Sequence, residues 1–234
     1  MRKDKRAPGD LRPISIQRGY LRHAEGSALI EIGETRVICS ATLDPGVPRW
    51  MMGKGRGWVT AEYGMLPRSS KQRINREADR GRTGRTHEIQ RLIGRCCRAA
   101  VEMKLLGENT VLVDCDVIEA DGGTRTASVT GACVALYDAL STLELKEHPM
   151  NFLVSAVSVG MVDGVPMLDL AYNEDSAAEV DLNVVMAESG AFIEVQGTAE
   201  RVPFTTEQFE AMLALARSGC QSLFEAQRAV LGIG

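Results

Sequence analysis

The sequence predicts an α+β protein with two lobes, and two observations point to this fold class. Short apolar runs typical of strands gather in groups, each followed by a longer helical pattern, and this order occurs twice along the 234 residues. The segment "EHPMN", residues 147–151, breaks the pattern between the two occurrences. We therefore predict a first domain at 1–150 and a second at 151–234.

The first half predicts five strands and two helices. Apolar residues at helical spacing, from Ile89 to Met103, predict a helix over 86–106 that ends at Gly107. A second, alanine-rich helix is expected at 125–143. The strands are expected at 13–18, 28–33, 36–43, 56–62 and 110–119.

The second half predicts four strands and one long helix. Asp163 and Gly164 form a dipeptide typical of a hairpin turn. A final helix is expected to begin after Thr205 or Thr206 and to run to about residue 228. The strands are expected at 152–161, 165–171, 180–187 and 191–197.

Charge is divided unevenly between the two ends of the chain. Residues 1–100 carry a net charge of +11 and residues 101–234 a net charge of −15. Such segregation favours a polyanionic partner for the first part. The alternative is a pair of complementary faces that pack on each other or on neighbouring subunits.

Cysteine usage and hydropathy indicate a cytoplasmic protein with no membrane span. The six cysteines lack a CxxC pattern and lie in apolar surroundings, which is typical of buried free thiols in a reducing compartment. "RKDKR" at the start is not followed by the apolar segment of a signal peptide, and no apolar run approaches 18 residues.

A basic segment, residues 68–85, fits no secondary structure. It holds six arginines and one lysine against two acidic residues. Its polarity and length favour a binding loop or a disordered arm, and the alternative is a solvated loop without a partner.

Two helix starts combine glycine, arginine and threonine. Gly123, Thr124 and Arg125 follow a strand and open the second predicted helix, and Arg85 stands in "GRTGRT" before the first. Helix N-termini expose unpaired N–H groups and arginine matches phosphate geometry, so the two starts would form one anion site if the fold joined them. The alternative for "GGT" is a plain helix cap with Arg125 in solvent. A P-loop motif is absent from the sequence.

Asp175 and Asp181 are candidates for a divalent cation site. Asp181 would share one strand face with Asn183, and Asp175 lies in a small-residue turn from which it can fold back. Two carboxylates, with Glu194 or Glu200 as further ligands, suit Mg²⁺. The alternative is an acidic turn followed by an edge strand. The three scattered histidines form neither a zinc pattern nor a catalytic triad.

Several long motifs resemble those of bacterial ribonuclease PH and keep their order from about residue 8 to 228. They include "HAEGSALIEIGETRVICSATL", "GWVTAEYGMLPRSS", "GRTHEIQRLIGRCCRAAV", "DCDVIEADGGTRTASVTGACVAL" and "EDSAAEVDLNVVM". Lys5 departs from the family, which usually places glycine in an Asp-Gly-Arg turn there. The departure bears on the conformation of the N-terminal arm alone.

The resemblance implies a phosphate-dependent 3′→5′ exoribonuclease that trims the 3′ ends of tRNA precursors and other structured RNA with 3′ tails. Inorganic phosphate would be the co-substrate, nucleoside diphosphates the products, and nucleotide addition the reverse reaction. The implied fold has two α/β lobes, the first like the second domain of ribosomal protein S5. The implied assembly is a homohexameric ring, a trimer of dimers.

The resemblance also assigns roles to residues of this sequence. Phosphate would be bound by Arg85, Gly123, Thr124 and Arg125, whereas catalysis and Mg²⁺ would depend on Asp175 and Asp181. The basic segment would bind the RNA backbone through Arg68, Lys71, Arg73, Arg76, Arg80 and Arg82. Two other functions stay open at this point: a non-catalytic RNA-binding ring subunit, and a hydrolytic nuclease that uses metal-bound water.

Overall fold

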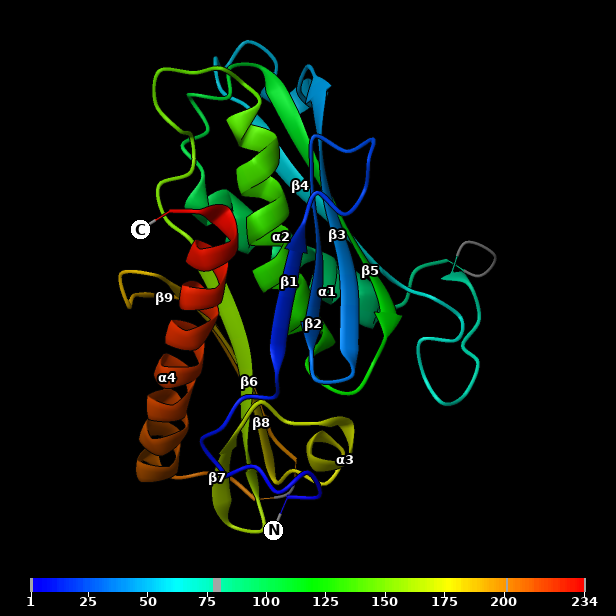
Figure 1. The fold of residues 1–234 in the computed structure, drawn as a ribbon, viewed down its shortest axis with the longest axis vertical. Helices are drawn as coiled ribbons and strands as arrows, with labels where there is room; N and C mark the ends of the chain where they lie inside the picture. The colour runs from blue at the N-terminus through cyan, green and yellow to red at the C-terminus, as the bar shows by residue number, and fades with distance from the viewer. Residues whose placement is uncertain (1, 78–80, 201, 234) are drawn as a thin grey trace.

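The computed structural model describes residues 2–77, 81–200 and 202–233, and its strands form two sheets (Figure 1). The first sheet has the strand order β1-β2-β3-β5-β4; β4 runs parallel to β5, and the other neighbours are antiparallel. Its strands are β1 (Ile14–Arg18), β2 (Gly26–Ile32), β3 (Thr35–Pro45), β4 (Trp58–Met65) and β5 (Asn109–Glu119). A short 3₁₀ turn, η1 (Arg49–Met51), lies between β3 and β4.

The second sheet is antiparallel throughout, with the order β7-β6-β8-β9. Its strands are β6 (Val154–Val162), β7 (Val165–Leu168), β8 (Val180–Ala187) and β9 (Phe192–Ala199). Every residue of β6 is buried, because α2 and α4 both pack against this strand. The predicted α+β class with two lobes is confirmed.

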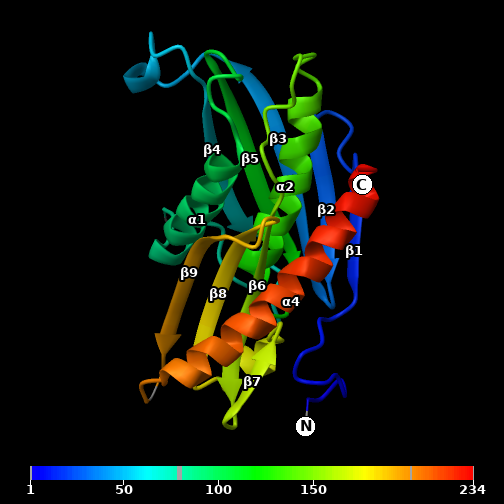
Figure 2. The ribbon, with the colours of Figure 1, turned by 90° about the vertical axis from the view of Figure 1, so that its left-hand side faces the viewer.

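Three long helices cover the sheets, and one short helix lies in the connection between β7 and β8 of the second lobe. The helix α1 (Gly84–Ala100) packs on β4, and α2 (Thr124–Ser141) packs on β2 and β3. The long helix α4 (Thr206–Leu231) crosses the second sheet (Figure 2). The four-residue helix α3 (Tyr172–Asp175) precedes β8.

Small side chains let α2 approach both sheets closely. The helix is buried over most of its surface, and an added Cβ on Gly131 would lie 2.7 Å from Cγ2 of Ile30 and 2.8 Å from Sγ of Cys39. Buried hydroxyls in this helix donate to carbonyls one turn earlier, as Ser128 does to Thr124 and Thr130 to Thr126. One cluster of buried apolar residues therefore includes residues of both lobes.

The turn before α2 lies against the backbone before α3. An added Cβ on Gly122 would lie 2.4 Å from the carbonyl oxygen of Leu170 and 2.8 Å from the nitrogen of Tyr172, and its φ is +81°. A side chain at this position would therefore force the first-lobe turn away from the second lobe. The contact fixes how α2 and α3 sit relative to each other.

Several predicted bounds differ from the structure, and in three places the local structure shows the reason. The helix α1 ends at Ala100 rather than at 106, because Val101 pairs with Met150 in a β-bridge. The strand β7 ends at Leu168 rather than at 171, because Asp169 has a φ of 53°. The predicted turn around Asp175 contains α3.

Other predictions concern the N-terminal arm, the cysteines and the membrane. Lys5 has a φ of 65°, a conformation that favours glycine, and its backbone N–H donates to the carbonyl of Arg2 at 3.0 Å. All six cysteines are buried free thiols. Within the described ranges, every helix is too short or too polar to cross a membrane. The domain boundary at 150 stays a proposal; it falls between α2 and β6.

We expect Gly122→Ala to lower the free energy of unfolding by about 3 kcal/mol or more, because it adds a steric clash to an unfavourable φ. Gly19→Ala is the matched control: its φ is +60° and nothing lies within 4 Å of the added Cβ. The control should cost about 1 kcal/mol. Denaturant unfolding of both variants measures the difference. Equal losses in the free energy of unfolding would show that the close contact at Gly122 does not affect stability.

Candidate active site

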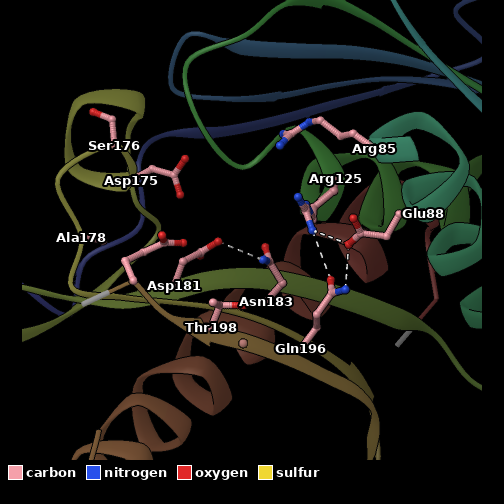
Figure 3. Close-up of a pocket in the computed structure, with 12 residues that line it drawn as sticks. Arg85, Glu88, Arg125, Asp175, Ser176, Ala178, Asp181, Asn183, Gln196 and Thr198 are labelled. Carbon is pink, nitrogen blue, oxygen red and sulfur yellow. Dashed lines mark hydrogen bonds and ion pairs between the residues drawn. The ribbon is translucent and has the colours of Figure 1, made fainter. Parts of the chain in front are cut away.

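A polar pocket of about 580 Å³ lies where the two lobes meet (Figure 3). Arg85 and Arg125 lie on one side of it, and Asp175 and Asp181 lie on the other. Arg85, Arg125 and the pair Asp175 and Asp181 come from three distant parts of the sequence, and the fold brings them into one cavity. The remaining lining residues are Glu88, Ser176, Ala178, Asn183, Gln196, Gly197, Thr198 and Glu200.

Each arginine is the second residue of a long helix. Arg85 follows Gly84 in α1, whose N-cap Thr83 accepts a hydrogen bond from the backbone N–H of Thr86 at 3.2 Å. Arg125 occupies the same position in α2, whose N-cap Gly123 has a φ of 68°. The first turns of both helices expose unpaired N–H groups and a partial positive charge, so this side of the pocket suits an anion.

Gly123 and Thr124 contribute differently from the arginines, because neither is among the residues that line the pocket. The Thr124 hydroxyl shares a 2.9 Å hydrogen bond with the hydroxyl of Tyr63 and is buried. The glycine supplies the left-handed backbone that starts the helix. Phosphate binding by these two residues stays a proposal, and their backbone N–H groups are the atoms available for it.

The carboxylates come from α3 and β8. Burial raises the pKa of Asp181 to about 6, the charge of Asp175 adds to this rise, and Arg125 opposes it. Burial also raises the pKa of Asp175, against the charges of Arg85 and Arg125. Both acids are therefore harder to ionise than a carboxylate in water.

The pair of carboxylates fits a divalent cation. Oδ1 of Asp181 is buried and, among the described residues, has no hydrogen-bond partner, while Oδ2 accepts a long 3.5 Å bond from Asn183. No cluster of three or more metal-ligating side chains occurs in the described ranges. Mg²⁺ needs no such cluster, because it keeps several waters and binds through one or two carboxylates and substrate phosphates. Asp175 and Asp181 are thus the residues that would hold it.

Glu88 and Gln196 are pocket residues that the sequence analysis did not identify. Arg125 donates from Nη1 to Oε1 of Glu88 at 3.2 Å and to Oε1 of Gln196 at 3.1 Å, and Gln196 Nε2 donates to Glu88 at 2.7 Å. Glu88 lies one helical turn after Arg85. Residues at this spacing share one face of a helix, so the sequence contained a signal for Glu88 as a pocket residue. Gln196 lies opposite Asn183 in the β8–β9 register, which the sequence did not reveal.

The two further acids proposed for the cation site have different positions. Glu200 lines the pocket, and its charge raises the pKa of both aspartates. Glu194 instead forms a bidentate ion pair with Arg95, with its Oε2 2.9 Å from Nε. Glu194 is therefore not available as a ligand in this structure.

The basic segment leads directly into α1 and Arg85. Its described cationic residues Arg68, Lys71, Arg73, Arg76 and Arg82 are exposed, and Arg80 lies outside the described residues. Most of their hydrogen bonds are local, as from Arg68 to the carbonyl of Lys71 at 3.3 Å. Arg82 differs, since it pairs with Glu62 on β4 at 2.6 Å. Exposed cations beside a polar pocket suit a polyanion.

Asp181→Asn should stabilise the protein at about pH 8 in the absence of divalent cations. Ionised Asp181 is disfavoured in the folded state, because its pKa of about 6 lies above the ordinary value of 3.8. The contribution of Asp181 to wild-type stability therefore falls as the pH rises from about 4 to 6, and the variant lacks this contribution. We expect a gain of about 1–2 kcal/mol at pH 8 that disappears near pH 3.5.

Asp44→Asn is the control for this experiment, because Asp44 is exposed at the end of β3. Its effect on the free energy of unfolding should stay within about 0.5 kcal/mol at both pH values. Denaturant titrations measure all three proteins. An Asp181→Asn variant that is no more stable than the wild type at pH 8 would contradict the raised pKa.

Two family models match the chain. Residues 10–141 match domain 1 of the 3′ exoribonuclease family, RNase PH, and residues 153–219 match domain 2 of the same family. Together these matches cover well over half of the sequence.

Solved structures share the fold at low sequence identity. The crystal structure of Rrp46 from rice (Oryza sativa) has a TM-score of 0.81 at 19% identity, over 98% of this chain and 100% of that chain. The Archaeoglobus fulgidus exosome with RNA bound to the active site has a TM-score of 0.81 at 22% identity, over 96% and 91%. An archaeal exosome core has a TM-score of 0.77 at 22% identity, over 97% and 91%.

The chain belongs to the 3′ exoribonuclease family of the RNase PH type.

Proposed function

We propose that this protein is a phosphorolytic 3′→5′ exoribonuclease like bacterial ribonuclease PH, a tRNA nucleotidyltransferase that trims the 3′ ends of tRNA precursors. The observation that carries the proposal is the single pocket in which Arg85 and Arg125 face Asp175 and Asp181. Inorganic phosphate would be the attacking group and nucleoside diphosphates the products. The buried free thiols favour a cytoplasmic location.

Electrostatics explains why both arginines are needed. A phosphate dianion must approach an anionic diester, and at about 5 Å with an effective dielectric near 20 each pair of unit charges repels by roughly 3 kcal/mol. The repulsion between the two anions therefore amounts to about 5–7 kcal/mol. One helix N-terminus stabilises a bound anion by at most about 2 kcal/mol. Two guanidinium groups and two helix starts together neutralise the phosphate and orient it.

The reaction then needs no covalent enzyme intermediate. A phosphate oxygen forms a bond to the terminal phosphorus, the bond to the preceding 3′-oxygen breaks, and the 3′-oxygen takes up a proton. Asp181, with its pKa of about 6, is a suitable donor of that proton near neutral pH. Proton donation by Asp181 is the alternative role; in the first assignment Asp175 and Asp181 would hold Mg²⁺, which would neutralise charge on the scissile phosphate and the leaving oxygen.

Assembly into a homohexameric ring, a trimer of dimers, is part of the proposal. The similar solved structures include chains of an Archaeoglobus fulgidus exosome and of an archaeal exosome core. The +11 and −15 charges of the two ends of the chain suit contacts between neighbouring subunits. A hydrodynamic mass near 25.4 kDa, the mass of one chain, would contradict it.

The product of the reaction distinguishes three functions. An RNA with a short 3′ tail should release nucleoside diphosphates, and release should require added phosphate. Monophosphates without a phosphate requirement would identify a hydrolytic nuclease, and binding without any product would identify a non-catalytic RNA-binding subunit.

Arg85→Ala should lower kcat/KM for phosphate at least about 100-fold, because it removes a charge-assisted contact in the transition state. Arg91→Ala is the matched control, since Arg91 is exposed on the same helix and does not line the pocket. The control should keep the wild-type value and both variants should keep the wild-type mass. Unchanged phosphorolysis by Arg85→Ala would refute the assignment of Arg85 to phosphate.

Added salt should weaken RNA binding, because the basic segment would bind the RNA through its phosphates. Replacing Arg68, Arg73 and Arg76 by alanine should reduce the slope of log K against log salt by about 2, at roughly 0.7 per phosphate contact with a single strand. A control triple variant removes three exposed cations elsewhere, at Arg22, Arg91 and Lys104. Equal slopes for the two triple variants, measured with a fluorescent RNA, would exclude the segment as the RNA contact.

A further inference from the structure

The N-terminal arm, residues 2–13, runs from the edge of the first sheet onto the second lobe (Figure 1). The carbonyl of Pro8 accepts a hydrogen bond from the backbone N–H of Leu168 at 2.8 Å. Arg2 and Arg12 on this arm are 6% and 5% exposed. A buried guanidinium group is costly unless it is fully paired, so the partners of these two residues indicate their role.

Arg12 joins the two lobes. Its Nε and Nη2 donate to the two carboxylate oxygens of Asp169 at 2.9 and 2.7 Å, and its backbone N–H donates to the same carboxylate at 2.8 Å. The same guanidinium also donates to the carbonyls of Asp121 and Gly122. It thereby ties the turn that starts α2 to Asp169, the residue that follows β7.

Arg2 holds α3 in place. Its Nε and Nη2 donate to Oε1 and Oε2 of Glu174 at 2.8 and 2.7 Å, and further bonds go to the carbonyls of Leu168 and Asp169. Glu174 also accepts from the backbone N–H of Ala171 at 2.9 Å. A helix of four residues has no stability of its own, so the placement of Asp175, the next residue, depends on this network.

We propose that Arg2 and Arg12 are positioning residues, which set the distance between the arginine side and the carboxylate side of the pocket. The inference rests on the proposed phosphorolysis and gives the N-terminal arm a role in that reaction. A displacement of about 1 Å costs a reaction of this kind up to about 100-fold in rate. A purely stabilising role would instead lower the folded fraction and leave the folded enzyme fully active.

The two arginines should have different effects. Arg2 contacts the α3 side alone, so Arg2→Ala should lower kcat at least about 30-fold and change the phosphate dissociation constant less than about threefold. Arg12 contacts both sides, so Arg12→Ala should lower kcat and also weaken phosphate binding. Steady-state kinetics gives kcat, and calorimetric titration with inorganic phosphate gives the dissociation constant.

Lys3→Ala is the matched control, because Lys3 is an exposed cation on the same arm. It should keep wild-type kcat and phosphate affinity. The milder changes Arg2→Lys and Glu174→Gln replace Arg2→Ala if that variant fails to fold. In the double variant Arg2→Ala/Glu174→Ala, the fold-loss in kcat should be smaller than the product of the two single losses, because the Arg2–Glu174 ion pair is common to both variants.

Hydrogen exchange separates this inference from the proposed function. In Arg2→Ala, amides of residues 171–176 should exchange faster, while those at the start of α2 should not. Wild-type kcat in folded Arg2→Ala, or unchanged exchange at 171–176, would overturn the inference. If the wild type itself releases no diphosphates, the proposed function fails, and the exchange result still decides whether the arm positions α3.

Discussion

The pocket depends on one close backbone contact, between the Gly122 turn and residues 170–172. The two lobes carry opposite halves of the chemistry: two guanidinium groups at the starts of α1 and α2, and two carboxylates on α3 and β8. Neither half is an active site alone. The absence of a side chain at Gly122 lets the halves approach, and the buried hydrogen bonds of the N-terminal arm maintain the distance between them.

Charge follows the same division. Cations gather in the basic segment and at the starts of α1 and α2, whereas the second lobe supplies Asp175, Asp181 and Glu200, and the first lobe supplies one acid of the pocket, Glu88. The pocket lies at the boundary between the two, so an anionic substrate meets positive charge on one side and a pair of carboxylates on the other. This explains why the overall charge of −4 says little about the partner.

Local patterns were enough to predict most elements and to single out Arg85, Arg125, Asp175 and Asp181, which line one pocket. The apolar spacing of α1, the alanine-rich run of α2 and the shared context of Arg85 and Arg125 are all properties of neighbouring residues. Convergence of the two arginines with Asp175 and Asp181 depends on contacts between distant segments. The opening "RKDKR" illustrates the limit, because its basic composition suggests a solvated surface, yet Arg2 is buried against Glu174, 172 positions away. The role of Gln196 likewise depends on the β8–β9 register, which alternation alone does not fix.

The hydrogen bonds of Arg125 have a consequence for repeated turnover. Its guanidinium donates to Glu88 and Gln196, so an oxyanion that binds Arg125 exchanges one set of acceptors for another. This exchange keeps the net free energy of binding small. When the diphosphate leaves, Glu88 and Gln196 compete with it for Arg125. A protein that shortens a polymer one unit at a time benefits from a cavity that empties as readily as it fills.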